Sequence, residues 1–211
     1  MALFVAYPNC NYSMECCDAM VTILNAHYNI KLFTQNDITP AFFKNIDIVT
    51  FPGGILDSDT HDDLFDQVDE ETITNYIDGG GHYLGICMGA YWAGKHYFDI
   101  LKGIDAVQYI KRPKADIRRS YGTIAPVIWN KKEESIYFYD GTAFLGKGRF
   151  KTIATYANGD PMAIIQKRIG LIGCHPESLK HWYNKKHLKP YWHEGEHHNL
   201  LLNFIDKLIE R

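Results

Sequence analysis

The sequence has no excess of charge of one sign, no long apolar run and no leader-like start. It holds 22 lysine and arginine residues against 25 aspartate and glutamate residues, for a net charge of −3. This balance argues against a general polyanion binder. No apolar run approaches the length of a membrane span, and residues 1–8 lack the basic region and the length of a signal peptide. We therefore expect a protein that binds neither nucleic acid nor a membrane.

The cysteines lack any regular spacing. The odd count of five shows no metal-finger spacing and gives no sign of a disulfide scaffold. Together with the missing leader, it predicts free thiols in a reducing, cytoplasmic setting, and we expect neither a metal nor a cofactor. The five are Cys10, Cys16, Cys17, Cys87 and Cys174.

The overall charge balance hides one basic run. It reads Lys111-Arg112-Pro113-Lys114 and is followed by Arg118 and Arg119. We interpret this run as a solvated loop, and contact with an anionic substrate or partner is the alternative.

The pattern of strands and helices predicts an α/β protein. At 211 residues with 46% hydrophobic composition, the chain can bury one core, and we expect a single domain over residues 1–211. In the first two-thirds, strand-like runs alternate with helical periodicity, which predicts a mostly parallel sheet covered on both faces. Expected strands are 3–7, 29–33, 46–51 and 82–86, and expected helices are 13–26, 38–44, 70–77 and 88–93.

The later part changes character and predicts a β-rich elaboration. Short apolar runs are separated by turn signals such as Asp140-Gly141, which favour hairpins. A final helix is expected at 198–209, with Leu201, Leu202, Ile205 and Leu208 on one face. Expected strands in this part are 121–129, 135–139, 151–156, 162–166 and 169–174.

The pentapeptide Gly85-Ile-Cys87-Met-Gly89 lies between an expected strand and an expected short helix. A nucleophile elbow is a sharp turn of this kind, which presents one side chain at the edge of a sheet. Glycines suit such a crowded turn. A thiol at the start of a helix is favoured as the thiolate, which is the attacking form. The pattern therefore indicates Cys87 as a nucleophile, and a buried structural thiol is the alternative.

A second motif, His175-Pro-Glu177, follows another apolar strand. A cysteine nucleophile needs a base, and the base needs a group that orients it. In an extended segment, residues two apart project to the same side. His175 and Glu177 can therefore supply the base and its orienting carboxylate, and capping of the next segment is the alternative role for Glu177.

A third motif, Pro52-Gly53-Gly54, follows an expected strand as well. Acyl transfer at Cys87 would place negative charge on a carbonyl oxygen, and backbone N–H groups should stabilise it. The amide of Met88 is the expected first donor. A glycine of the Gly53-Gly54 pair is the expected second donor, because a loop without side chains can approach a ligand closely.

Taken in order, Phe51-Pro-Gly-Gly54, Gly85-Ile-Cys-Met-Gly89 and His175-Pro-Glu177 resemble the class I glutamine amidotransferase-like superfamily. The resemblance implies a flavodoxin-like three-layer sandwich with a Cys87-His175-Glu177 triad, and Gly54 and Met88 as oxyanion donors. The chain is most similar to the glutamine amidotransferase-like N-terminal domain of biotin–protein ligases, in its stand-alone form. The biotin-ligating domain has no counterpart here, so biotin ligation is not implied.

One position departs from the superfamily pattern. Glutaminases of this group commonly carry a glutamine four residues after the nucleophile, where this sequence has Tyr91. The departure argues against glutamine as the substrate, and Tyr91 is a candidate for lining the pocket. We expect a thiol-dependent amidase, hydrolase or amidotransferase-like protein that acts on a small amide or acyl compound. A partner enzyme that receives the product is left open.

Two alternatives belong to other classes of protein. One is a non-catalytic binding or regulatory module on the same scaffold. The other is a zinc hydrolase, because His193-Glu194-Gly-Glu-His197 matches H-E-x-x-H. Gly195 weakens the helix that such a site requires, so we interpret the match as chance. We also expect Cys16-Cys17 to pack one thiol inward and one outward, and Cys174 to fill the core.

Overall fold

The computed structural model describes residues 1–5, 11–54, 65 and 69–210, with only the backbone described at 11–13 and 70. Cys10 and the end of the first expected strand lie outside these residues. No helix in the described part of the chain is both long and apolar enough to cross a membrane.

A nine-stranded sheet organises the protein, in the order β2-β1-β3-β4-β11-β10-β9-β6-β7. The strands from β2 to β11 in this order are parallel, and those from β11 to β7 are antiparallel. The parallel part therefore has the 2-1-3-4-5 order of a flavodoxin-like sheet. Its strands are β1 (Ala2–Phe4), β2 (Lys31–Phe33), β3 (Ile48–Phe51), β4 (His82–Ile86) and β11 (Ile169–Ile172).

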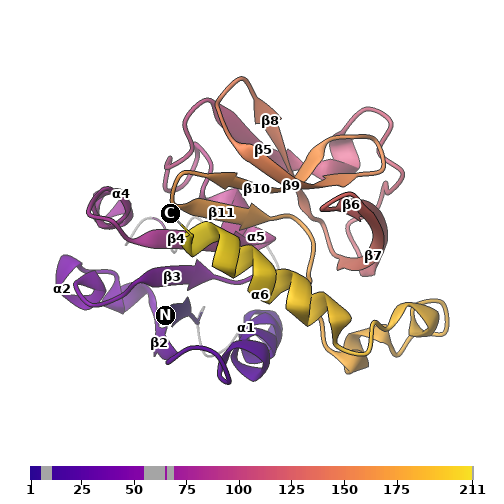
Figure 1. Cartoon of the computed structure of the whole chain (residues 1–211), viewed down its shortest axis with the longest axis horizontal. Coiled ribbons are helices and arrows are strands. Elements are labelled where there is room, and N and C mark those ends of the chain that lie inside the picture. The colour runs from indigo at the N-terminus through magenta and orange to yellow at the C-terminus, as the bar shows by residue number, and fades with distance from the viewer. Residues whose placement is uncertain (6–10, 55–64, 66–68, 211) are drawn as a thin grey trace.

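The antiparallel part is the β-rich elaboration expected from the sequence, and Figure 1 shows it to one side of the parallel strands. It contains β6 (Thr123–Trp129), β7 (Lys132–Phe138), β9 (Lys151–Tyr156) and β10 (Pro161–Gln166). A separate antiparallel pair is formed by β5 (Ile104–Gln108) and β8 (Thr142–Gly146).

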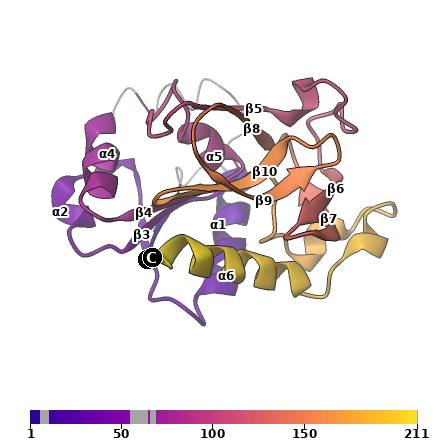
Figure 2. The same cartoon turned by 45° about the horizontal axis from the view of Figure 1, so that its top comes forward.

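Helices cover both faces of the sheet and make a three-layer sandwich. One face carries α1 (Asn11–Leu24) and α6 (Glu196–Ile209), and the other carries α2 (Pro40–Phe43), α4 (Glu70–Asp78) and α5 (Met88–Trp92). In Figure 2, α6 runs along one side of the sheet, while α5 and the β5–β8 pair lie on the other side.

Successive side chains along each strand point alternately into these two cores. Leu3 and Leu84 point into the core under α1 and α6, whereas their neighbours Phe4 and Tyr83 point into the opposite core. Both sides of β1, β3, β4 and β11 are therefore buried, which explains why these strands are nearly continuous apolar runs. The edge strand β2 differs, because Lys31 and Leu32 are exposed.

The expected fold class is confirmed, and the expected helices and strands match the observed ones closely in most places. The sequence prediction missed β5 and β8. It also placed Leu202 with the buried face of α6, where Phe204 is buried and Leu202 is only half-buried. The expectation of one outward thiol in the Cys16-Cys17 pair was wrong, because both side chains are buried.

The H-E-x-x-H segment has a structural role. Gly195 has φ 92° and precedes the first residue of α6, so His193 lies outside the helix that carries His197. Nδ1 of His193 accepts the backbone N–H groups of Gly195 and His197, both at 3.2 Å. His193 thus caps the first turn of α6, whose N–H groups would otherwise lack partners. The two histidines are not on one helical face, as a zinc-hydrolase site would require.

This cap predicts acid sensitivity. Burial, followed by the charges of neighbouring histidines, lowers the pKa of His193 to about 3 and that of His197 to about 4. An unfolded histidine titrates near 6.5. The stabilisation is therefore complete above about pH 6.5 and is lost as the pH falls toward 4. Thermal unfolding measured from pH 7 to 4.5 should show a falling melting temperature. The fall should be shallower in His193→Asn, which keeps an acceptor that does not titrate.

The matched control is His27→Asn, which changes an exposed histidine. It should follow the wild-type slope. Identical slopes for all three proteins would show that the cap does not set the acid response.

Candidate functional site

The turn after β4 has the strained geometry of a nucleophile elbow. Cys87 adopts φ 50° and ψ −102°, and α5 begins at the next residue. A non-glycine residue with positive φ persists only where its surroundings enforce it. The two flanking glycines allow the required contacts. A Cβ at Gly85 would lie 2.4 Å from the carbonyl oxygen of Gly89, and one at Gly89 would lie 2.0 Å from that of Phe51.

Hydrogen bonds hold this elbow from both sides. The N–H of Cys87 donates to the carbonyl of Ile172 at 2.8 Å, which extends the β4–β11 ladder by one residue. The carbonyl of Cys87 accepts from Oγ1 of Thr142 at 3.1 Å. The residue is only 7% exposed, and its thiol donates to the carbonyl of Tyr139 at 3.3 Å. The thiol is thus fixed between β4 and the segment that leads into β8.

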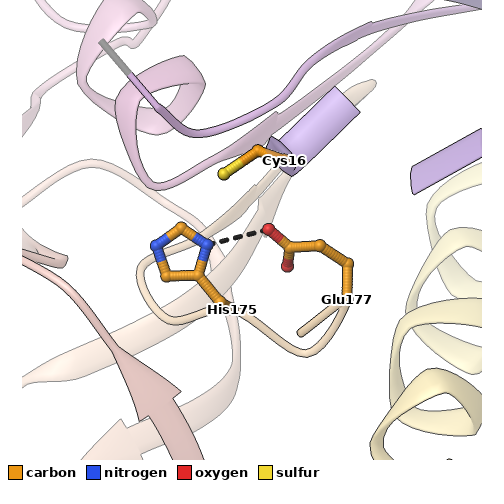
Figure 3. A group of neighbouring side chains, drawn as sticks. All are labelled: Cys16, His175 and Glu177. Atoms are coloured by element: carbon orange, nitrogen blue, oxygen red, sulfur yellow. Dashed lines mark hydrogen bonds and ion pairs between the residues drawn. The ribbon is translucent and has the colours of Figure 1, made fainter. Parts of the chain in front are cut away.

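His175 and Glu177 lie beyond the end of β11 as a buried pair. Nδ1 of His175 and Oε1 of Glu177 are 2.8 Å apart, and the side chains are 4% and 0% exposed. Figure 3 shows the imidazole with Nδ1 toward the carboxylate and Nε2 turned away from it. Nε2 is buried and makes no hydrogen bond among the described residues. The carboxylate therefore fixes the ring and leaves Nε2 for another partner.

The charge state of His175 is set by competing effects. Burial alone lowers the pKa of this imidazole, but the Glu177 carboxylate and the thiols of Cys87 and Cys16 more than offset burial. The pKa of His175 consequently lies well above its ordinary value of 6.5. The surroundings therefore favour the protonated form of the ring, and both thiols lie close enough to interact with it.

Cys16 is a residue of this site that the sequence interpretation missed. Figure 3 shows its sulfur over the imidazole of His175. A Cβ built on Gly53 would lie 2.7 Å from Cε1 of His175, 3.3 Å from Cβ of Cys87 and 3.4 Å from Sγ of Cys16. Gly53 thus lies at the centre of these three side chains. The missing side chain of Gly53 is what lets them come together.

The residues expected from the three motifs surround one cavity of about 330 Å³. Gly54, Cys87, Met88, Tyr91 and His175 line it. Gly53 and Glu177 lie behind this wall, against His175. The structure therefore brings every expected site residue to one edge of the sheet, where β3, β4 and β11 end.

Tyr91 ties the elbow to the opposite wall of the cavity. Its hydroxyl donates to the carbonyls of Asp140 and Gly141, at 3.0 and 3.2 Å. Burial raises the pKa of this phenol above its ordinary value of 10, so it remains a donor. The position that departs from the glutaminase pattern thus holds the 139–142 segment against α5. The Asp140-Gly141 turn signal was the sequence feature that marked this segment.

Cys16, His175 and Glu177 are also a candidate metal group, since their ligand atoms lie within 4.8 Å of one another. The geometry favours a hydrogen-bonded arrangement instead. Nδ1 of His175 and Oε1 of Glu177 already form a 2.8 Å bond with each other, which occupies two of the three ligand atoms. We interpret this group as support for the His175 ring.

Solved structures share this architecture. A glutamine amidotransferase from Thermotoga maritima aligns with a TM-score of 0.66 at 11% identity, over 100% of this chain and 99% of that chain. The chain has a glutamine amidotransferase-like fold. A second structure described as a glutamine amidotransferase gives a TM-score of 0.65 at 14% identity, over 97% and 98% of the two chains. A cytoplasmic protein of Salmonella typhimurium LT2 gives 0.60 at 12% identity, over 99% of both.

The sequence itself points to a narrower relationship within this amidotransferase-like fold. Residues 9–103 match the family described as "Biotin-protein ligase, N terminal". This match includes the Gly53-Gly54 and Cys87 motifs, while the His175 motif lies beyond it. No curated protein matches the sequence. The resemblance inferred from the sequence is thereby confirmed for residues 9–103 and for the fold.

The protonated state of Cys16 can be tested by alkylation. With a pKa of about 11, the Cys16 thiol is about one part in a thousand thiolate at pH 8, and it is only 5% exposed. Iodoacetamide should therefore modify Cys16 of the native protein at least about 100-fold more slowly than in the urea-unfolded protein, as read by peptide mass spectrometry. Equal rates in the two states would contradict this placement of the thiol.

Proposed function

We propose that this protein is a thiol-dependent amidase or amidotransferase-like enzyme that uses Cys87, His175 and Glu177 on a small amide or acyl compound. The observation that carries the proposal is the buried 2.8 Å His175–Glu177 bond beside a strained elbow cysteine. A fully buried imidazole–carboxylate pair adds little to the stability of the fold, because the free-energy cost of removing both groups from water offsets their attraction. A purely structural role therefore explains the pair poorly. The four free cysteines of the described chain suit a reducing, cytoplasmic setting.

In the first half of the reaction, the Cys87 thiolate attacks the acyl carbon of the substrate. Nε2 of His175 first takes the proton of the Cys87 thiol, and the resulting imidazolium stabilises the thiolate. The carbonyl oxygen becomes an oxyanion, which the backbone N–H groups of Met88 and Gly54 can bind. When the C–N bond breaks, Nε2 of His175 gives its proton to the departing amine, which leaves a thioester on Cys87.

In the second half, water or an amine attacks the thioester. Nε2 of the now neutral His175 takes a proton from this nucleophile, and Cys87 leaves as the thiolate. Glu177 keeps Nδ1 protonated throughout, so that Nε2 is the nitrogen that exchanges the proton. Water gives a carboxylic acid, and an amine gives a new amide.

One observation favours the non-catalytic alternative. The Cys87 thiol donates to the carbonyl of Tyr139, and Nε2 of His175 makes no hydrogen bond within the part of the chain that the structure describes. A binding module could retain this arrangement without transferring a proton. Catalytic contacts are often loose before substrate binds, however, so this geometry is also compatible with an enzyme.

Replacement of Cys87 distinguishes an enzyme from a non-catalytic binding module. A panel of primary amides and thioesters should yield a turnover that Cys87→Ala abolishes, and mass spectrometry should find an acyl group on Cys87 of the wild-type protein only. The fold should persist, because alanine at this site removes one sulfur atom. Turnover that survives in Cys87→Ala would rule out the mechanism. Substrate binding without turnover in the wild type would support the binding module.

Glu177→Gln tests the role of the orienting carboxylate. The Glu177 carboxylate helps to raise the pKa of His175, so its neutral isostere should lower that pKa. The imidazolium is then lost at a lower pH, and the alkaline limb of the pH–rate profile should move to lower pH. The rate should also fall by roughly 100-fold or more, because the ring loses its tautomer and orientation. Glu133→Gln, at an exposed glutamate, should leave the profile unchanged.

A further inference from the structure

The charged side chains around the candidate cavity are unbalanced. Two carboxylates, Glu15 and Asp140, line it, and neither a lysine nor an arginine of the described chain does. The His175 ring also lines the cavity, but its Nδ1 is paired with the buried carboxylate of Glu177 at 2.8 Å, so it leaves no unpaired positive charge there. Glu15 lies at the exposed rim, where Oε1 is 3.1 Å from Nε2 of His181. Asp140 is half-buried, and the hydroxyl of Tyr91 donates to its backbone carbonyl at 3.0 Å.

The negative charge of the Asp140 carboxylate is offset by few hydrogen bonds. Oδ2 accepts one hydrogen bond from the neutral amide of Gln108 at 2.9 Å, and Oδ1 is buried without a partner among the described residues. Burial raises the pKa of this carboxyl, which the Gln108 bond and the charge of Lys111 partly counter. A poorly solvated carboxylate with one neutral partner produces a negative potential in the space next to it.

The basic run 111–119 does not cancel this potential by lining the cavity. Nε of Arg112 pairs with Oδ2 of Asp160 at 2.8 Å, and Arg118 donates to the carbonyl of its neighbour Arg112 at 3.0 Å. Lys111 acts on Asp140 from outside the lining. The anionic-ligand alternative for this run therefore has no support at the cavity.

Aromatic rings form much of the remaining wall. Tyr137 and Trp182 pack edge to face with centroids 5.2 Å apart, and Trp182 lies 5.7 Å from the ring of His175 in the same manner. Tyr91 and Tyr139 also line the cavity. Aromatic faces attract cations as well as apolar groups. Carboxylates combined with aromatic rings favour a positively charged group over a negative one.

We infer that the cavity selects a cationic substrate, namely an amide or acyl compound that carries an ammonium or guanidinium group and no carboxylate, and that Asp140 determines this preference. The inference deepens the proposed function and rests on it for the acyl-transfer step. It gives a reason why glutamine is a poor candidate, because its ammonium group comes with a carboxylate that no lysine or arginine of the described lining can bind. The ammonium or guanidinium end of the compound lies toward Asp140, while its acyl carbon lies at Cys87.

The charge preference can be measured without any catalysis. Cys87 is exposed to three methanethiosulfonates that differ in charge: 2-aminoethyl (cationic), methyl (neutral) and 2-sulfonatoethyl (anionic). Each rate is divided by the rate with free 2-mercaptoethanol, and peptide mass spectrometry assigns modification to Cys87 rather than Cys16. Because one thiol reacts with all three reagents, its own reactivity cancels from the ratio. We expect the cationic reagent to be favoured over the anionic one by at least tenfold.

Asp140→Asn should reduce this ratio by about tenfold, since one nearby charge is removed and asparagine can still accept from Gln108. Asp105→Asn makes the same chemical change at an exposed position of β5, outside the cavity lining, and should leave the ratio unchanged. A normalised ratio near one in the wild type, or a ratio that Asp140→Asn does not alter, would overturn the inference.

Three amides of one chain length connect the preference to turnover: 5-aminopentanamide, pentanamide and glutaramic acid. We expect 5-aminopentanamide to be cleaved fastest, with an advantage that Asp140→Asn removes. Fastest cleavage of glutaramic acid would keep the proposed function and overturn the charge preference. Failure to cleave any of them, with the reagent ratio intact, would count against the acyl-transfer function and support the cationic pocket.

Discussion

The site depends on the pairing of three neighbouring parallel strands, β3, β4 and β11. Ile86 at the end of β4 is in register with Ile172 at the end of β11, and Phe51 of β3 with Gly85 of β4. Parallel strands end at the same edge of a sheet, so the segments that follow them must meet there. Those segments carry Gly53-Gly54, Cys87 and His175. A shift of one residue in this register would turn the strands over and separate the three motifs.

The second requirement is that the chain should leave β4 at a sharp angle. The positive φ of Cys87 is unfavourable for any residue with a side chain, and three kinds of contact maintain it. The β4–β11 ladder holds its N–H, Thr142 holds its carbonyl, and the glycines around it allow the close approach of neighbouring backbone. The strain is therefore supported by the sheet, by β8 and by the turn itself. Such over-determined strain is typical of positions where a side chain must be presented in one orientation.

Much of this arrangement follows from sequence patterns, and the exceptions have physical reasons. The expected strand 82–86 and the His175-Pro-Glu177 segment matched because strong local signals and tertiary packing agree there. Cys16 was missed because an amphipathic pattern shows that a residue is buried, but it does not show which side chain lies opposite. The β5–β8 pair was missed because Asp105 and Gln108 interrupt the apolar pattern of β5, and β8 lies between two glycine turns. Pairing between distant segments supplies the stability that neither strand shows alone.

The same contrast between local pattern and tertiary context explains two sequence features that did not fit the proposed function, the H-E-x-x-H motif and Tyr91. The H-E-x-x-H pattern indicates a zinc site only if both histidines lie on one face of a helix. Here α6 begins after Gly195, so His193 lies before the helix and His197 lies within it. Tyr91 departs from a family pattern, yet it is built into the site through two hydrogen bonds to the segment that holds Asp140. A glutamine side chain is shorter than the tyrosine side chain and lacks its rigid ring, so it could not reach the same two carbonyls from this position. The residue that argues against glutamine as the substrate therefore also holds in place the backbone of Asp140, whose carboxylate gives the cavity its negative potential.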